Sequence, residues 1–97
     1  MMPTIHLNGD TPERLMDDLL AAGKALRAAM KALQEAAPNS RNYYVQGPDA
    51  YGKAAKEHAS RQQRVQEVYN EIVEMAEYIS EQKGIRDKAR RHQRGED

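Results

Sequence analysis

The sequence contains no cysteine, no tryptophan and no phenylalanine, and all five of its aromatic residues are tyrosines. Without cysteine the chain can form no disulfide, no thiolate metal site and no cysteine nucleophile. Without phenylalanine and tryptophan it lacks the side chains that fill most volume in a core. A chain of 97 residues also buries a smaller share of its surface than a larger one. A dense core within one copy is therefore hard to build.

Long apolar runs are missing as well. No run approaches the roughly 18 residues that a membrane-spanning helix needs. The first residues, Met1 to His6, lack the basic and apolar segments of a secretory signal. Lysine plus arginine equals aspartate plus glutamate, at 15 each, so the net charge of zero favours no particular partner. We therefore expect a cytoplasmic protein that engages no membrane.

A first helix is predicted over about residues 11–37. Thr11 suits the N-cap, Pro12 the first helical position and Glu13 the positive helix end. Pro38 then ends the helix. Apolar residues recur along it at alternating spacings of four and three, the heptad pattern of packed helices: Leu15, Leu19, Ala22, Leu26, Ala29, Leu33 and Ala36. Four residues beside this seam widen it: Met16, Gly23, Met30 and Ala37.

A second helix is predicted over about residues 48–83, with Pro48 in its first turn and Gly84 as a left-handed stop. Its seam is small or polar at first and apolar later: Tyr51, Ala54, Ala55, His58, Gln62, Val65, Val68, Tyr69, Ile72, Met75, Ala76 and Ile79. We predict an all-α fold, a long antiparallel, coiled-coil-like helical hairpin with a short extended N-terminal arm. The hairpin domain covers residues 1–84, and residues 85–97 form a charged tail.

The expected register follows from folding the two helices back at their connection. Residues whose numbers sum to about 85 then lie side by side, so Ile79 lies near Leu7. Ile5 and Leu7, which alternate with polar residues in the arm, are expected to pack on an apolar surface.

Two helices alone leave part of each apolar stripe in water, and burial stabilises by roughly 25 cal/mol per Å². We therefore expect a homodimer or higher homo-oligomer that assembles into a helical bundle. The candidate interface residues are Leu15, Leu19, Val65, Tyr69, Ile72, Val73 and Met75. Acidic residues gather at one end of the hairpin and basic residues at the other, which favours an antiparallel partner. Alternatively, each charge is solvated on an outer face, or the basic tail folds onto its own acidic end.

No catalytic or metal-binding pattern is recognisable, so we expect no cofactor and no enzyme activity. His6, His58 and His92 lie far apart in the sequence, and none has a partner at the spacing of a helical metal site. His58, which lies on the seam near Gln62, is better explained as a hydrogen-bonded polar layer that specifies register. No serine lies in a nucleophile-elbow pattern.

The connection between the helices is the second candidate site. Arg41 supplies a planar cation for phosphate or carboxylate, Tyr43 and Tyr44 offer stacking faces, and Lys53 and Lys56 follow. Together they predict binding of a small anion or nucleotide. The alternative is that the tyrosines close the end of the bundle and Arg41 caps helix carbonyls. Nucleic-acid binding is not expected, because acids interrupt the basic tail and no aromatic residue lies within it.

Two groups of residues resemble small helical proteins encoded by bacteriophages and prophages. They are Ile5-His6-Leu7-Asn8-Gly9 and Glu35-Ala36-Ala37-Pro38, the latter followed by Arg41, Tyr43-Tyr44 and Gln46-Gly47-Pro48. The resemblance implies viral origin and action inside a bacterial host. Such proteins include virion accessories and inhibitors of host defence, and some of the inhibitors are oligomers that sequester signalling nucleotides. Two hypotheses follow: an oligomer that acts by protein–protein interaction on a host or phage protein, and a nucleotide-sequestering anti-defence protein.

Overall fold

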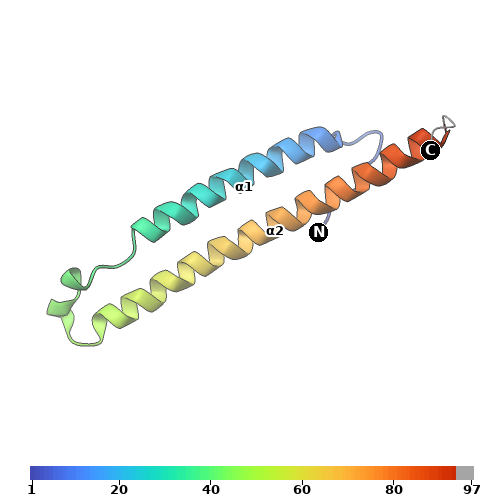
Figure 1. Cartoon of the computed structure of the whole chain (residues 1–97). Helices are drawn as coiled ribbons and strands as arrows, with labels where there is room; N and C mark the ends of the chain where they lie inside the picture. The colour runs from blue at the N-terminus through green and yellow to red at the C-terminus, as the bar shows by residue number, and fades with distance from the viewer. Residues whose placement is uncertain (94–97) are drawn as a thin grey trace. The chain divides into compact units, whose positions relative to one another are not determined.

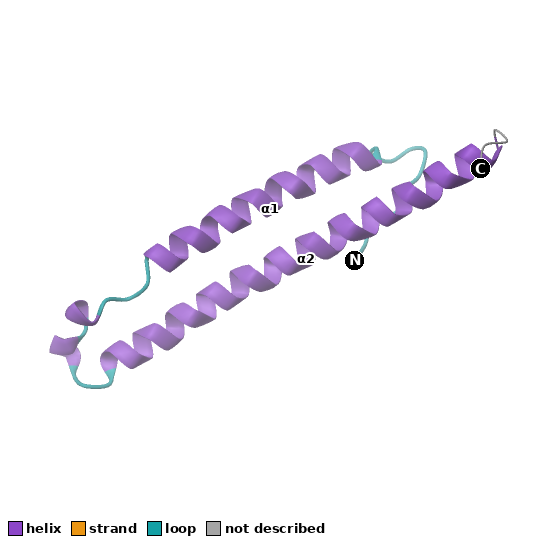
Figure 2. Ribbon diagram, viewed as in Figure 1, coloured by secondary structure: helices purple, strands orange, loops and turns teal. Residues whose placement is uncertain are grey.

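The structure is a computed structural model that describes the backbone of residues 1–93 and the side chains of residues 1–85. Within residues 1–93 it holds two α-helices, two 3-10 helices and no strand (Figures 1 and 2). In chain order they are α1 (Pro12–Glu35), η1 (Ser40–Asn42), η2 (Tyr44–Gln46) and α2 (Ala50–Gln93). The prediction of an all-helical hairpin is confirmed, because α1 and α2 pack against each other.

Packing divides the chain into two compact units. Unit 1 combines Met1–Gly23 with the chain from Glu71 onward, and unit 2 is Lys24–Asn70. In unit 1 the Nζ of Lys83 lies 3.2 Å from Oε1 of Glu13, near the start of α1. In unit 2 the Nε2 of His58 lies 2.6 Å from the carbonyl oxygen of Leu33, near the end of α1. Each unit thus contains a part of α1 packed antiparallel to a part of α2.

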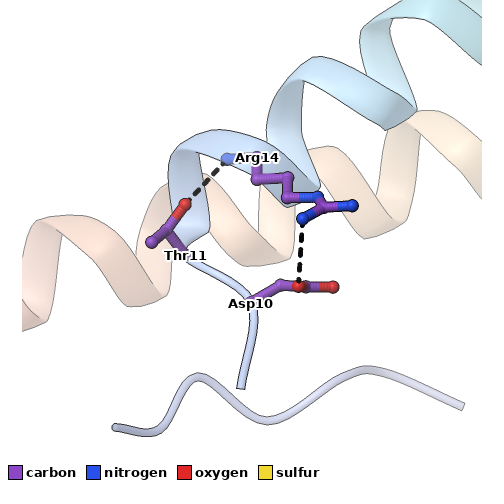
Figure 3. A network of polar contacts seen from close by, with 3 residues as sticks. All are labelled: Asp10, Thr11 and Arg14. Carbon is purple, nitrogen blue, oxygen red and sulfur yellow. Dashed lines mark hydrogen bonds and ion pairs between the residues drawn. The ribbon is translucent and has the colours of Figure 1, made fainter. Parts of the chain in front are cut away.

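The start of α1 follows the capping chemistry expected from the sequence. The Thr11 hydroxyl accepts a hydrogen bond from the backbone N–H of Arg14 at 3.1 Å, as an N-cap side chain does (Figure 3). Pro12 occupies the first helical position and is buried. The Arg14 guanidinium lies 3.9 Å from the Asp10 carboxylate (Figure 3), but both side chains are largely exposed, so this ion pair adds little stability.

The connection between α1 and α2 is built from turns. The last turn of α1 tightens where the Ala36 N–H donates to the Leu33 carbonyl. Asn39 then caps η1, its side-chain oxygen accepting from the Arg41 N–H at 3.0 Å. Gly47 has a φ of 121°, which glycine adopts readily and other residues do not. Its conformation ends η2 and leads into α2.

The predicted end of the second helix at Gly84 is wrong, because α2 continues to Gln93. Gly84 does not have the positive φ of a left-handed stop; among the described glycines only Gly47 has one. A single glycine inside a helix costs only about 1 kcal/mol, and the residues after it favour helix without an intervening proline. The helix therefore extends into the segment predicted as a charged tail, and residues 94–97 of that segment lie outside the described residues.

The predicted register is also wrong. Ile79 lines a hollow in unit 1 with Pro12 and Met16, not with Leu7, which is 91% exposed. Leu33 meets His58, whereas a sum of 85 pairs it with Gly52. The connection explains the difference. With His58 opposite Leu33, the first residues of α2, from Ala50 onward, lie beyond the end of α1 at Glu35. In the arm Ile5 is half-buried, so the expected apolar packing does not extend to Leu7.

The core is small. Among residues 1–85 only four are buried: Pro12, Ala54, His58 and Ile79. In the second half of α1 the half-buried residues are Leu26, Met30 and Leu33, while the predicted seam residues Ala29 and Ala36 are exposed. A single copy therefore shields its seams only in part.

Candidate functional site

The seven candidate interface residues share one degree of burial. All are half-buried, and none is fully shielded or fully exposed: Leu15, Leu19, Val65, Tyr69, Ile72, Val73 and Met75. Each helix therefore turns part of its apolar stripe toward the other and leaves part of it to water. Whether a second chain covers the remainder stays a prediction.

Two aliphatic side chains in the middles of the helices are more exposed than these seven, and the interface prediction did not include them. Leu20 in α1 is 60% exposed and Val68 in α2 is 44% exposed. A helical protein gains by covering such side chains, since their transfer out of water is favourable. Val68 belongs to the predicted seam of the second helix, and the order of charges around both residues is a further signal in the sequence.

The charges change sign at both of these residues. Asp17 precedes Leu20 by three positions and Lys24 follows it by four. In α2 the order is reversed, with Arg64 four positions before Val68 and Glu71 three positions after it. Residues three and four apart are neighbours on a helix surface. Each exposed aliphatic residue thus lies between an acidic and a basic side chain, all four of which are exposed.

His58 is the one buried titratable residue among those whose side chains are described, and it is only 6% exposed. Its Nε2 donates to the Leu33 carbonyl, which has no proton to give and also accepts from the Ala36 N–H. This contact gives a second donor to a carbonyl near the carboxyl end of α1, where the last carbonyls lack the regular partners of a helix interior. His58 is thus hydrogen-bonded as expected, with a backbone carbonyl as its partner, and its role in specifying register stays a prediction.

The predicted ligand-binding residues do not form one site. Lys53 and Lys56 line an open hollow of about 450 Å³ together with Asp49, Pro48 and Gly52. The lining does not include Arg41, Tyr43 or Tyr44. The structure therefore brings together two of the five residues and places a carboxylate beside them.

The connection residues have other surroundings. The Arg41 Nε donates to the side-chain oxygen of Asn39 at 3.4 Å, and its backbone N–H donates to the same atom. These contacts hold the Arg41 guanidinium against its own turn, not against α1 carbonyls. Tyr43 is half-buried, whereas Tyr44 and its neighbour Val45 are among the most exposed large apolar residues of the connection.

A second hollow, of about 340 Å³, lies in unit 1. Met16 and Ile79 supply its apolar part, and Glu13, Asp17 and Lys83 its charged part. The Lys83 ammonium is engaged by Glu13 at 3.2 Å. Among the described residues, no group of three or more histidine, aspartate or glutamate side chains could hold a metal ion.

Comparison with protein-family models, with curated proteins and with solved structures finds no match to the chain. No helix within the described residues combines the length and apolar character that crossing a membrane requires. The function must therefore be argued from the surface and the core of the chain itself.

Proposed function

We propose that this chain is a non-enzymatic, self-associating helical protein that acts by protein–protein interaction. The observation that carries the proposal is the small core. Of the residues with described side chains, only Pro12, Ala54, His58 and Ile79 are buried. The seven candidate interface residues of the seam are only half-buried in a single copy, and Leu20 and Val68 are exposed.

Partial exposure of the seam has an energetic cost. Apolar burial stabilises by roughly 25 cal/mol per Å², so several half-covered aliphatic side chains represent several kcal/mol that one copy does not gain. The net stability of a small domain is of the same order, about 5–15 kcal/mol. A partner chain that covers the seam supplies the missing burial. Bundles formed by two helical hairpins do this with the side chains that each hairpin leaves open.

The polar groups support binding in preference to catalysis. A catalytic acid or base needs an environment that perturbs it, together with a nearby reacting group. His58 is buried, but its Nε2 is engaged by the Leu33 carbonyl. The carboxylates and lysines of the two hollows lie on open surfaces. The expected setting, a phage- or prophage-encoded protein inside a bacterial host, rests on the sequence resemblance alone.

Sedimentation equilibrium over a wide range of protein concentration tests this proposal. We expect a mass of two chains or a higher multiple, with dissociation on dilution, because the seam is covered only by association. A mass of one chain at every concentration would contradict it.

The alternative proposal, binding of a small anion or nucleotide, is supported by the lysine pair of unit 2. Lys53 and Lys56 line the same hollow, but Asp49 weakens its attraction for an anion. A thermal-shift series with inorganic phosphate, ATP and a cyclic dinucleotide tests it. A rise in melting temperature that Lys53→Ala abolishes and Arg41→Ala does not would place the ligand in this hollow.

A further inference from the structure

One face of α2 carries an ordered series of side chains that α1 does not cover fully. Its members follow one another at spacings of three and four, which place them on one side of the continuous helix Ala50–Gln93. They are Arg61, Arg64, Val68, Glu71, Met75 and Tyr78, here called the Val68 face. Met75 and Tyr78 are half-buried, and the other four are exposed.

The Val68 face lies beside the seam that packs on α1. That seam repeats every seven residues through His58, Val65, Ile72 and Ile79, and it includes the two most buried of the described side chains of α2. Val68 follows Val65 by three positions, so it sits at the edge of the covered surface. An adjoining chain could extend the packing there without separating α1 from α2.

The charges of the Val68 face are arranged around its centre. Arg64 lies four positions before Val68, and Glu71 lies three positions after it. Farther out, Arg61 is seven positions before Val68 and Glu74, beside the face, is six positions after it. Basic side chains therefore lie on one side of the exposed valine and acidic side chains at similar distances on the other.

This order matches what a two-fold axis requires. In a contact between two identical antiparallel helices, a residue at the axis meets its own copy, and residues on either side exchange partners. A charged residue at the axis would face a like charge, whereas valine faces valine. With Val68 near the axis, Arg64 of one copy faces Glu71 of the other, and Arg61 faces Glu74.

We propose that the Val68 face binds a second copy of this chain in antiparallel orientation, with Val68 close to the two-fold axis. The inference rests on the proposed self-association and adds to it the surface, the direction and the paired residues. A parallel pair would place Arg64 on Arg64 and Glu71 on Glu71, which repel each other. Charge order thus selects the antiparallel pair, and valine, methionine and tyrosine supply its apolar contact.

Charge reversal tests the direction of pairing. In the antiparallel pair Arg64→Glu brings two carboxylates together at two symmetric positions, and Glu71→Arg brings two cations together. Because an exposed pair contributes up to about 1 kcal/mol, reversing both symmetric pairs should weaken the dimer about tenfold or more. The double variant Arg64→Glu/Glu71→Arg restores opposite charges and should recover wild-type dissociation. A mixture of the two single variants should form a mixed dimer, detectable by native mass spectrometry.

Substitution at the axis gives an independent test. Val68→Glu places two carboxylates at the closest approach of the copies and should dissociate the dimer. Val45→Glu is the control, because Val45 is also an exposed valine, 74% against 44% for Val68, but lies in η2 of the connection. It should leave the dissociation constant unchanged. Circular dichroism of every variant should show wild-type helix content, which separates loss of pairing from loss of folding.

The outcomes distinguish the pairing from the proposed function. A monomeric wild-type chain would overturn both. A dimer that Arg64→Glu, Glu71→Arg and Val68→Glu leave intact would overturn the pairing and keep self-association. The variant Arg90→Glu/Arg91→Glu tests the basic residues after Gly84 as an alternative partner. If it weakens the dimer and the single variants of the Val68 face do not, those basic residues pair with the acidic residues of unit 1. The proposed pairing through the Val68 face is then wrong.

Discussion

The two units of the chain hold their helices together in different ways. The centre of unit 1 is aliphatic, with Ile79 only 1% exposed and packed near Pro12 and Met16. The centre of unit 2 is small and polar, with buried Ala54 and the bond from His58 to the Leu33 carbonyl. Apolar contact is strong but indifferent to register, whereas a hydrogen bond requires one donor to meet one acceptor. The most buried aliphatic side chain therefore lies in unit 1, and the register-specific hydrogen bond lies in unit 2.

The units also differ in charge. The sequence of unit 1 contains eleven acidic and seven basic residues, and that of unit 2 contains eight basic and four acidic residues. Their net charges, −4 and +4, cancel over the whole chain, which is why composition alone indicated no preferred partner. Like charges within one unit repel each other weakly at the surface. The separation of charge therefore favours a partner of the same sequence in the reverse direction.

The largest loss of stability is expected when the aliphatic centre of unit 1 is removed. Ile79→Ala should lower the free energy of unfolding by about 2–5 kcal/mol, because it deletes a fully buried side chain and leaves a cavity. Urea unfolding at one fixed protein concentration measures this loss. Ile85→Ala serves as the control, since Ile85 is 57% exposed, and should change stability far less. Equal effects of the two substitutions would contradict an aliphatic core in unit 1.

A smaller effect is expected in unit 2. His58→Leu keeps an apolar side chain of similar size but removes the donor to the Leu33 carbonyl, which retains the bond from the Ala36 N–H. The free energy of unfolding should fall by about 1 kcal/mol, the net worth of one hydrogen bond. His58→Gln can still donate and should recover part of the loss. A His58→Leu protein as stable as wild type would show that the bond contributes nothing net.

The smallest expected effect has the opposite sign and compares the two units within one helix. Gly52 of unit 2 and Gly84 of unit 1 both lie in α2, and a Cβ added at either meets no atom within 4 Å. Gly52→Ala and Gly84→Ala should therefore each stabilise the chain by about 0.8 kcal/mol through helix propensity. Thermal unfolding with circular dichroism measures the change. If only Gly84→Ala lowers stability, Gly84 has the left-handed conformation of a helix end, as the sequence predicted.

Local chemistry accounts for the features that sequence analysis predicted correctly. The Thr11 cap, the proline at the start of α1 and the heptad spacing from Leu15 to Leu33 depend on residues within one or two turns of each other. The seven candidate interface residues were proposed in the same way, because periodicity identifies a stripe, and their role in an interface stays a prediction. Periodicity does not distinguish the covered edge of a stripe from its open edge, so it did not show that Leu20 and Val68 are more exposed than these seven.

The helical class, the beginning of α1, the apolar seams and the separation of charge can all be predicted from the sequence. They follow from side-chain type and from spacings shorter than a helix. Three features required the folded chain: Ile79 packs near Pro12, His58 meets Leu33, and α2 passes through Gly84. The first two depend on the length and the turns of the connection, which decide which residue of α2 lies opposite a given residue of α1. The third depends on a balance of about 1 kcal/mol between one glycine and the helix formers around it, which local rules do not resolve.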